Sequence, residues 1–190
     1  MNERLVLESI VTTVDATGNV NIAPMGPHVD RSLQRIALKP FKTSVTYQNL
    51  LSNPFATVHV VDDVLLIAQA AIGSVQPKPE MRRIDDRWSI LTDACRWFAI
   101  EIDNWDDDEL RPTGEGRVVR SGSQRDFFGF NRAKHAVIEL AILATRVHML
   151  PVDELLSEID RLRVPVDKTG GDQEHSAFDL LAVYIRGNSA

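Results

Sequence analysis

The chain has 190 residues, 44% of them hydrophobic and 25% charged, which are ordinary values for one globular domain or a domain with an appendage. Its net charge of −6 disfavours broad nucleic-acid binding, which needs a positive surface. A single cysteine, Cys95, excludes an intramolecular disulfide, and the longest apolar run, 64–72, is too short to span a membrane. No signal-peptide pattern is visible. We therefore expect a soluble, cytoplasmic protein that binds neither nucleic acid nor membrane.

The first two thirds of the chain predict a β-rich domain that contains a short helix. Strand composition and turn residues indicate a hairpin at the start, in which Pro24 requires an edge position or a strand end. Thr43 and Ser44 are good N-cap residues for a short helix that runs to Leu51. The expected strands cover 5–14, 20–25, 32–38, 55–61, 95–102 and 114–121.

The remaining segments predict helices and loops. The apolar segment 64–72, which Asp62 or Asp63 could cap, predicts a buried helix, and 74–94 predicts a long surface loop because of its prolines and mixed charge. Three helices are expected at 131–149, 151–163 and 176–186, with a linker at 164–172. We therefore expect a β-barrel with helices, of the α+β class. Residues 1–125 form its core, and 126–190 form a C-terminal three-helix segment packed on it as one integral domain.

The densest polar cluster, at 39–49, surrounds the start of the short helix. A helix start presents unpaired N–H groups and the positive end of the helix dipole. The hydroxyls of Thr43, Ser44 and Thr46 add donors, and Lys42 adds positive charge. These features favour a phosphate site, although an ordinary capped helix with solvated lysines has the same composition.

A second candidate segment lies at 21–27. Gly26 permits close approach of a ligand or of backbone, and the prolines on either side restrict the chain. Met25 is suited to contact with an aromatic ring face. The alternative is a strand that ends in a proline-bounded turn.

Taken together and in order, these segments resemble the FMN-binding split β-barrel superfamily. Within it the chain is similar to an uncharacterised prokaryotic family, domain of unknown function 447. The resemblance covers nearly the whole chain. It is carried by 8–13, 23–26, 39–50, 62–73 and 129–146.

The resemblance implies a six-stranded split barrel and a homodimer with FMN near the subunit interface. It places the FMN phosphate at the hydroxyls of the short helix, with Lys42 as the charged partner. The end of the second strand would lie along the isoalloxazine ring or the ribityl chain. The expected FMN-binding residues are Met25, Gly26, Pro27, Pro40, Phe41, Lys42, Thr43, Ser44, Thr46, Tyr47, Asn49 and Arg132.

A polar stripe of Arg132, His135, Glu139 and Arg146 follows one face of the first C-terminal helix. Arg132 is a candidate contact to flavin or substrate. The alternative for the stripe is a buried ion network or a polar seam at a dimer interface.

The other polar and aromatic features predict no further site. The acidic run 103–109 lacks the alternating ligands of a calcium loop, and the five histidines show no ligand spacing, so we predict no metal site. Trp88, Trp97 and Trp105 are expected in the core or at an interface.

These features predict an FMN-binding flavoprotein, with oxidoreductase activity towards an undefined substrate. Two alternatives stay open, a flavin-binding or carrier module without turnover and a barrel that has lost the cofactor. No glycine-rich dinucleotide fingerprint follows a strand, so the sequence defines neither an electron donor nor a catalytic residue.

Overall fold

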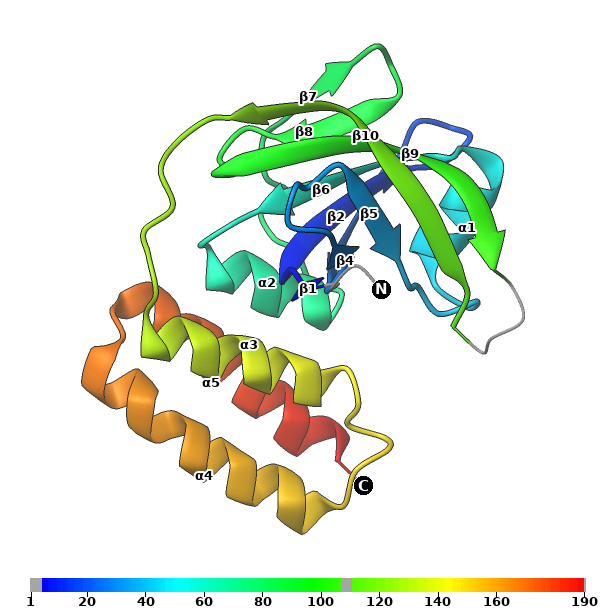
Figure 1. Ribbon diagram of the computed structural model, residues 1–190. Helices are drawn as coiled ribbons and strands as arrows, with labels where there is room; N and C mark the ends of the chain where they lie inside the picture. The colour runs from blue at the N-terminus through cyan, green and yellow to red at the C-terminus, as the bar shows by residue number, and fades with distance from the viewer. Residues whose placement is uncertain (1–4, 107–110, 190) are drawn as a thin grey trace. The chain divides into compact units, whose positions relative to one another are not determined.

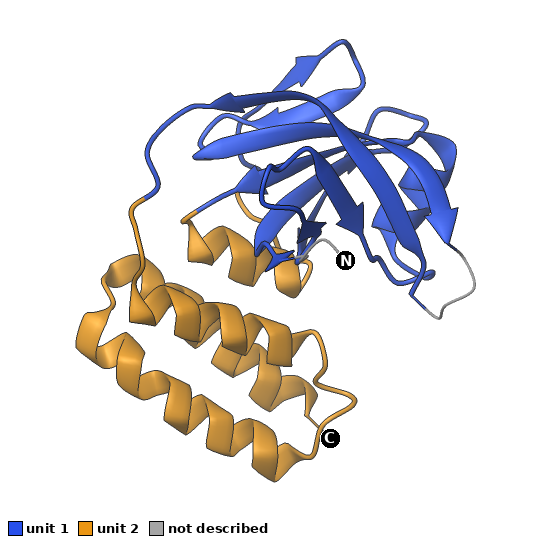
Figure 2. Cartoon of the chain, in the orientation of Figure 1, with its two compact units in different colours: residues 1–61, 78–127 blue, residues 62–77, 128–190 orange. Residues whose placement is uncertain are grey.

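The computed structural model describes residues 5–106 and 111–189 (Figure 1). The chain divides into two compact units, shown in different colours in Figure 2. The barrel unit comprises residues 1–61 and 78–127, and the helical unit comprises 62–77 and 128–190. The segment 62–77 is therefore a helical-unit segment inserted within the sequence of the barrel unit.

The barrel unit is built on a curled, antiparallel eight-stranded sheet with the order β1-β4-β5-β10-β9-β6-β2-β3 (Figure 1). This confirms the expected barrel fold, although the sheet has two more strands than the resemblance implies, because β1 and β4 are separate two-residue strands. Pro24 lies in the edge strand β3, as predicted. The strands are β1 (Leu5–Val6), β2 (Ser9–Val14), β3 (Val20–Met25), β4 (His28–Val29), β5 (Arg35–Leu38), β6 (Phe55–Val60), β9 (Arg96–Asp106) and β10 (Thr113–Ser123).

The expectation of a long surface loop at 74–94 is wrong. This segment contains a hairpin of β7 (Met81–Ile84) and β8 (Trp88–Leu91). Asp85, Asp86 and Arg87 connect the two strands. The N–H of Arg87 donates to the carbonyl of Ile84, and the central residues Asp85 and Asp86 have φ values of 49° and 53°, the left-handed backbone of a type I′ turn. The prolines that suggested a loop precede both strands, and the short apolar and charged pattern of β7 carries little periodicity.

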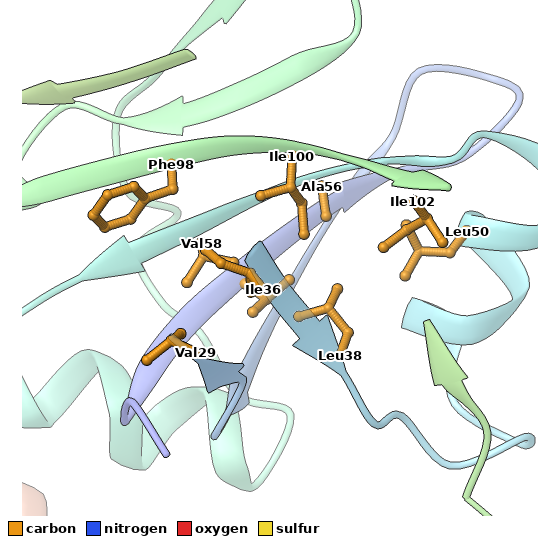
Figure 3. Packing of buried hydrophobic residues seen from close by; sticks show 10 residues of the cluster. Val29, Ile36, Leu38, Leu50, Ala56, Val58, Phe98, Ile100 and Ile102 are labelled. Atoms are coloured by element: carbon orange, nitrogen blue, oxygen red, sulfur yellow. The ribbon is translucent and has the colours of Figure 1, made fainter. Parts of the chain in front are cut away.

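Apolar side chains cover both faces of the central strands. Along β6, Ala56 and Val58 lie in the larger core cluster, whereas Phe55 packs against a second cluster around Trp88 and Trp97. This alternation follows from the two-residue period of a strand. Figure 3 shows the larger cluster, which consists of Val11, Val29, Ile36, Leu38, Leu50, Ala56, Val58, Phe98, Ile100 and Ile102.

The β7–β8 hairpin is attached to the large sheet by side-chain hydrogen bonds as well as by apolar packing. The buried Trp88 donates from Nε1 to the carbonyl of Ile100 at 2.9 Å. The hydroxyl of Thr12 donates to the carbonyl of Ser89 at 2.6 Å. The hairpin is therefore an integral layer of the barrel unit.

The helical unit consists of α2 (Val64–Ala71), α3 (Arg132–Ala144), α4 (Val152–Thr169) and α5 (Asp172–Asn188). Asp63 caps α2 by accepting a hydrogen bond from the N–H of Leu66, which confirms the predicted start of this helix. α2 packs against both α3 and α5. The three expected C-terminal helices are therefore present, and α2 completes the bundle. No helix in 5–106 or 111–189 is both long and apolar enough to cross a membrane.

The predicted linker at 164–172 is also wrong, because α4 continues through Pro165 to Thr169. Val166 is fully buried, and this packing outweighs the cost of a proline inside a helix. The hydroxyl of Thr169 donates to the carbonyl of Pro165 at 2.8 Å. The break between α4 and α5 is confined to Gly170 and Gly171.

A partly buried ion pair joins the beginnings of α2, α3 and α5. Lys134 donates to a carboxylate oxygen of Glu174 and to the carbonyl of Asp62, each at 2.7 Å. Burial acts to raise the pKa of Glu174, but hydrogen bonds from Lys134 and from the N–H of Gly171 outweigh it and lower that pKa. The carboxylate of Asp62 accepts from the N–H of Phe128 at 2.9 Å. Asp62 and Phe128, the two residues at which the chain enters the helical unit, are thus bonded to each other, and Asp62 is bonded to Lys134 as well.

Candidate functional site

The candidate site surrounds the start of α1 (Val45–Ser52) in the barrel unit. Ser44 is the N-cap and accepts a hydrogen bond from the N–H of Tyr47 at 3.2 Å. The side chains of Lys42 and Thr43 are exposed just before the helix. No acidic residue lies in its first turn. The helix start therefore presents positive potential and exposed donors without a carboxylate to repel an anion.

Two of the predicted phosphate ligands, Thr46 and Asn49, face the barrel instead of solvent. Thr46 is 2% exposed, and its hydroxyl accepts from the Asn21 amide at 3.0 Å. Asn49 donates to the hydroxyl of Thr13 at 3.1 Å. These bonds attach α1 to β2 and β3, and they bring α1 beside the strand that ends at Met25.

The end of the β9–β10 hairpin also packs on α1. The rings of Tyr47 and Trp105 meet edge to face, with centroids 5.2 Å apart. On β10, a Cβ at Gly114 would lie 2.9 Å from the indole of Trp105, so only glycine leaves room for this ring. Tyr47 is thus a packing residue on the inner side of α1.

The segment that leads into α1 makes a contact that the sequence analysis missed. The guanidinium of Arg111 lies 4.3 Å from the ring centre of Phe41. Arg111 also donates to the carbonyl of Lys39 at 2.8 Å. Pro40, which lies between Lys39 and Phe41 in the sequence, is buried, whereas Phe41 is half exposed. No local pattern marked Arg111, because it is brought here by the antiparallel pairing of β10 with β5, in which Gly114 faces Leu38.

The segment Met25–Pro27 lies at the end of β3, which Asn21 ties to α1. A Cβ at Gly26 would lie 2.7 Å from a methyl group of Val6. The carbonyl of the buried Pro27 accepts from the N–H of Leu7 at 3.0 Å. Close approach of the N-terminal strand therefore accounts for the glycine at position 26.

The remaining candidate, Arg132, begins α3 in the helical unit and is exposed. His135, Glu139 and Arg146 are exposed as well. The interpretation of this stripe as a buried ion network is therefore wrong. The side chains that fill the core at the start of α3 are Ala133 and Ala136 instead.

The curled sheet, with a short capped helix beside its edge strand, defines the class of the split β-barrels. A family model described as "Protein of unknown function (DUF447) N-terminal domain" matches residues 7–125, and a second DUF447 model matches residues 131–182. The chain belongs to the DUF447 family.

Solved structures share this fold. The FMN-bound protein MM1853 from Methanosarcina mazei, itself a DUF447 protein, is 23% identical, with a TM-score of 0.83 over 96% of each chain. The styrene monooxygenase flavin reductase of Pseudomonas putida S12 is 13% identical, with a TM-score of 0.52 over 63% of this chain and 81% of that one. An FMN-binding protein from Thermus thermophilus is also 13% identical, with a TM-score of 0.54 over 63% and 72%.

Proposed function

We propose that this protein binds FMN, with the FMN phosphate at the start of α1. The observation that carries the proposal is the helix start itself, where Ser44 is the cap and Lys42 and Thr43 are exposed. This donor set suits a phosphate dianion, because first-turn N–H groups, an exposed hydroxyl and a lysine lie within a few residues of one another and no acidic residue lies in the first turn. The FMN-bound DUF447 structure and the flavin-binding structures of the same fold support the choice of ligand.

The proposed ligand set is narrower than the sequence suggested. Thr43 supplies the exposed hydroxyl, and Ser44 caps the helix immediately before its first turn. Thr46 and Asn49 hold the helix on the barrel through their internal hydrogen bonds. Met25, Gly26 and Pro27 stay candidates for the flavin ring or the ribityl chain because β3 is tied to α1.

Purified protein tests the proposal directly. We expect a flavin absorption spectrum, and mass spectrometry of the released ligand should give FMN. Thr43→Ala should weaken FMN binding about tenfold to a hundredfold, because it deletes a charge-assisted hydrogen bond. Riboflavin, which lacks the phosphate, should bind the variant as it binds the wild type.

Thr145→Ala, which removes an exposed threonine of the helical unit, is the matched control. It should leave the affinities for both flavins unchanged. If Thr43→Ala weakens FMN and riboflavin equally, the phosphate does not lie at α1. A wild-type protein that binds no flavin would overturn the proposed function.

Redox turnover is the second part of the proposal. When bound, FMN supplies hydride and electron transfer, and the protein supplies binding and electrostatics. The flavin reductases among the structures of this fold favour an oxidoreductase over a carrier. Anaerobic reduction of the bound flavin by NADH or NADPH would support the oxidoreductase, and a flavin that neither donor reduces would favour the carrier.

We also propose a homodimer in the cytoplasm. Phe41, Val45 and Leu51, in and before α1, are more than half exposed, at 52%, 58% and 54%, and a second chain would cover such residues. The single cysteine, Cys95, is buried, which suits a reducing compartment. Light scattering that gives the mass of one chain, 21.3 kDa, at micromolar concentration would overturn the dimer.

A further inference from the structure

Arg111, two residues before β10 begins at Thr113, contributes a cation to the start of α1. Arg111 contacts two residues of the segment that leads into this helix, the carbonyl of Lys39 at 2.8 Å and the ring of Phe41 at 4.3 Å. Phe41 is itself part of the turn before the helix, because its carbonyl accepts from the N–H of Ser44 at 2.9 Å. Arg111 is therefore held at the turn that ends in the N-cap of α1.

This placement is built into the packing of the barrel unit. Trp105, near the end of β9, packs against Tyr47 of α1, and Gly114 of β10 makes room for its indole. Trp105 thereby attaches the end of β9 to the helix, and the pairing of β10 with β5 holds Gly114 opposite Leu38, next to the segment that leads into α1. A guanidinium that reaches the site from such a fixed position is pre-organised, which reduces the entropy lost when it binds a ligand.

The chemistry of Arg111 matches the proposed ligand. A guanidinium has five N–H donors in a planar fork that suits phosphate oxygens, and the bond to Lys39 uses one of them. Together with Lys39 and Lys42 it brings a third cation to this segment of a chain whose net charge is −6.

We propose that Arg111 is a ligand of the flavin phosphate and makes the site selective for FMN over riboflavin. This inference rests on the proposed function, and it assigns a role to a residue remote in sequence from α1. The other interpretation is that Arg111 only supports the loop before the helix. The two differ in one measurable quantity, the ratio of the affinities for FMN and riboflavin.

The experiment measures both affinities by flavin fluorescence quenching for the wild type, Arg111→Gln and Arg111→Lys. We expect Arg111→Gln to weaken FMN about tenfold to a hundredfold and to leave riboflavin unchanged, because the lost contact is charge-assisted. Arg111→Lys keeps the charge but loses the planar fork, so its FMN affinity should lie between that of the wild type and that of Arg111→Gln. FMN binding by Arg111→Gln should also depend less on salt than binding by the wild type.

Arg117→Gln is the matched control, because it removes the same charge from an exposed arginine of β10 that pairs with Glu101. It should leave the affinity ratio at the wild-type value. Equal effects of Arg111→Gln and Arg117→Gln, or a parallel loss of FMN and riboflavin, would overturn the role of Arg111. If Arg111→Gln does not fold, Arg111→Lys decides, because a wild-type affinity ratio in that variant contradicts the inference. A wild type that binds no flavin refutes the proposed function itself. If the wild type binds FMN, the proposed function stands, and the variants test the role of Arg111 alone.

Discussion

His59 accepts a hydrogen bond at Nε2 from the backbone N–H of Leu91, at 3.1 Å. Its other ring nitrogen, Nδ1, lies 3.1 Å from the carbonyl of Ile10 and therefore donates to it. Both ring nitrogens of the neutral imidazole are thus hydrogen-bonded, and His59 of β6 links β2 to β8. Burial of this ring lowers the pKa of His59 to about 4.

This burial predicts how stability depends on pH. The unfolded chain takes up a proton at His59 near pH 6.5, whereas the folded chain does so only near pH 4. Acidification between these values therefore favours unfolding, and the contribution is complete above pH 6.5 and decreases as the pH falls to about 4. The total change is about 3 kcal/mol. Urea unfolding between pH 4.5 and pH 7.5 measures it.

His59→Gln keeps a donor and an acceptor but does not titrate, so its stability should vary less with pH. His148→Gln, at an exposed position, should keep the wild-type pH dependence. If the wild type and His59→Gln show the same slope, the imidazole is not responsible.

A second prediction concerns two threonines on neighbouring strands. Within the described residues, Thr57 has a fully buried hydroxyl without a hydrogen-bond partner, whereas the hydroxyl of Thr12 donates to Ser89 at 2.6 Å. Thr57→Val should raise the free energy of unfolding by up to about 1 kcal/mol, because a buried hydroxyl without a partner is unfavourable. Thr12→Val should lower it by about 1–3 kcal/mol, since it leaves the Ser89 carbonyl without this donor. Chemical denaturation of both variants checks the contrast, and a loss of stability in Thr57→Val would contradict it.

The ion pair between Lys134 and Glu174 gives a third prediction. Their side chains are 13% and 10% exposed, so Lys134→Met leaves a carboxylate partly buried without its cation. We expect a loss of about 3 kcal/mol in the free energy of unfolding. Adding Glu174→Gln should recover part of this loss, because the uncompensated charge is removed.

Arg161→Met is the control, since it breaks an exposed pair with Glu158 and should cost less than about 1 kcal/mol. Denaturant unfolding of Lys134→Met, of Glu174→Gln and of the double variant measures the coupling energy between Lys134 and Glu174. Strictly additive effects would mean that the pair does not act as a unit.

The fourth prediction is that the barrel segment does not fold well alone. A chain that ends at Arg125 keeps α2 but loses α3 and α5, against which α2 packs. The side chains of Val64 and Ile67 would then meet water. We expect an aggregating product without a cooperative thermal transition. The variant with Val64→Gln and Ile67→Gln in the shortened chain should be more soluble, and a soluble, cooperative unsubstituted chain would contradict the prediction.

The sequence allowed much of the barrel and all the C-terminal helices to be predicted, because their signals are local. Strand composition, Pro24 at the edge and Asp63 before α2 are examples. The β7–β8 hairpin was missed because its strands have only four residues each, Met-Arg-Arg-Ile and Trp-Ser-Ile-Leu, and neither alternates between apolar and polar residues. The full length of α4 was missed because the burial of Val166, a tertiary effect, overrides Pro165.

For the candidate site, the sequence located the start of α1 and its cap, since capping is also local. It did not separate the exposed Thr43 from the inward-facing Thr46, because that depends on where Asn21 of β3 lies. It also missed Arg111, whose contacts exist only after β5 and β10 have paired.

The insertion of α2 within the sequence of the barrel unit bears on how the protein is made. A ribosome releases the apolar residues of α2 well before α3 and α5 emerge. At typical rates of synthesis, this interval is on the order of ten seconds. During that time the nascent chain exposes the apolar residues of α2 while the later strands of the sheet are still unpaired. Chaperone capture during translation is therefore expected to centre on 62–77 and to end when α5 leaves the exit tunnel.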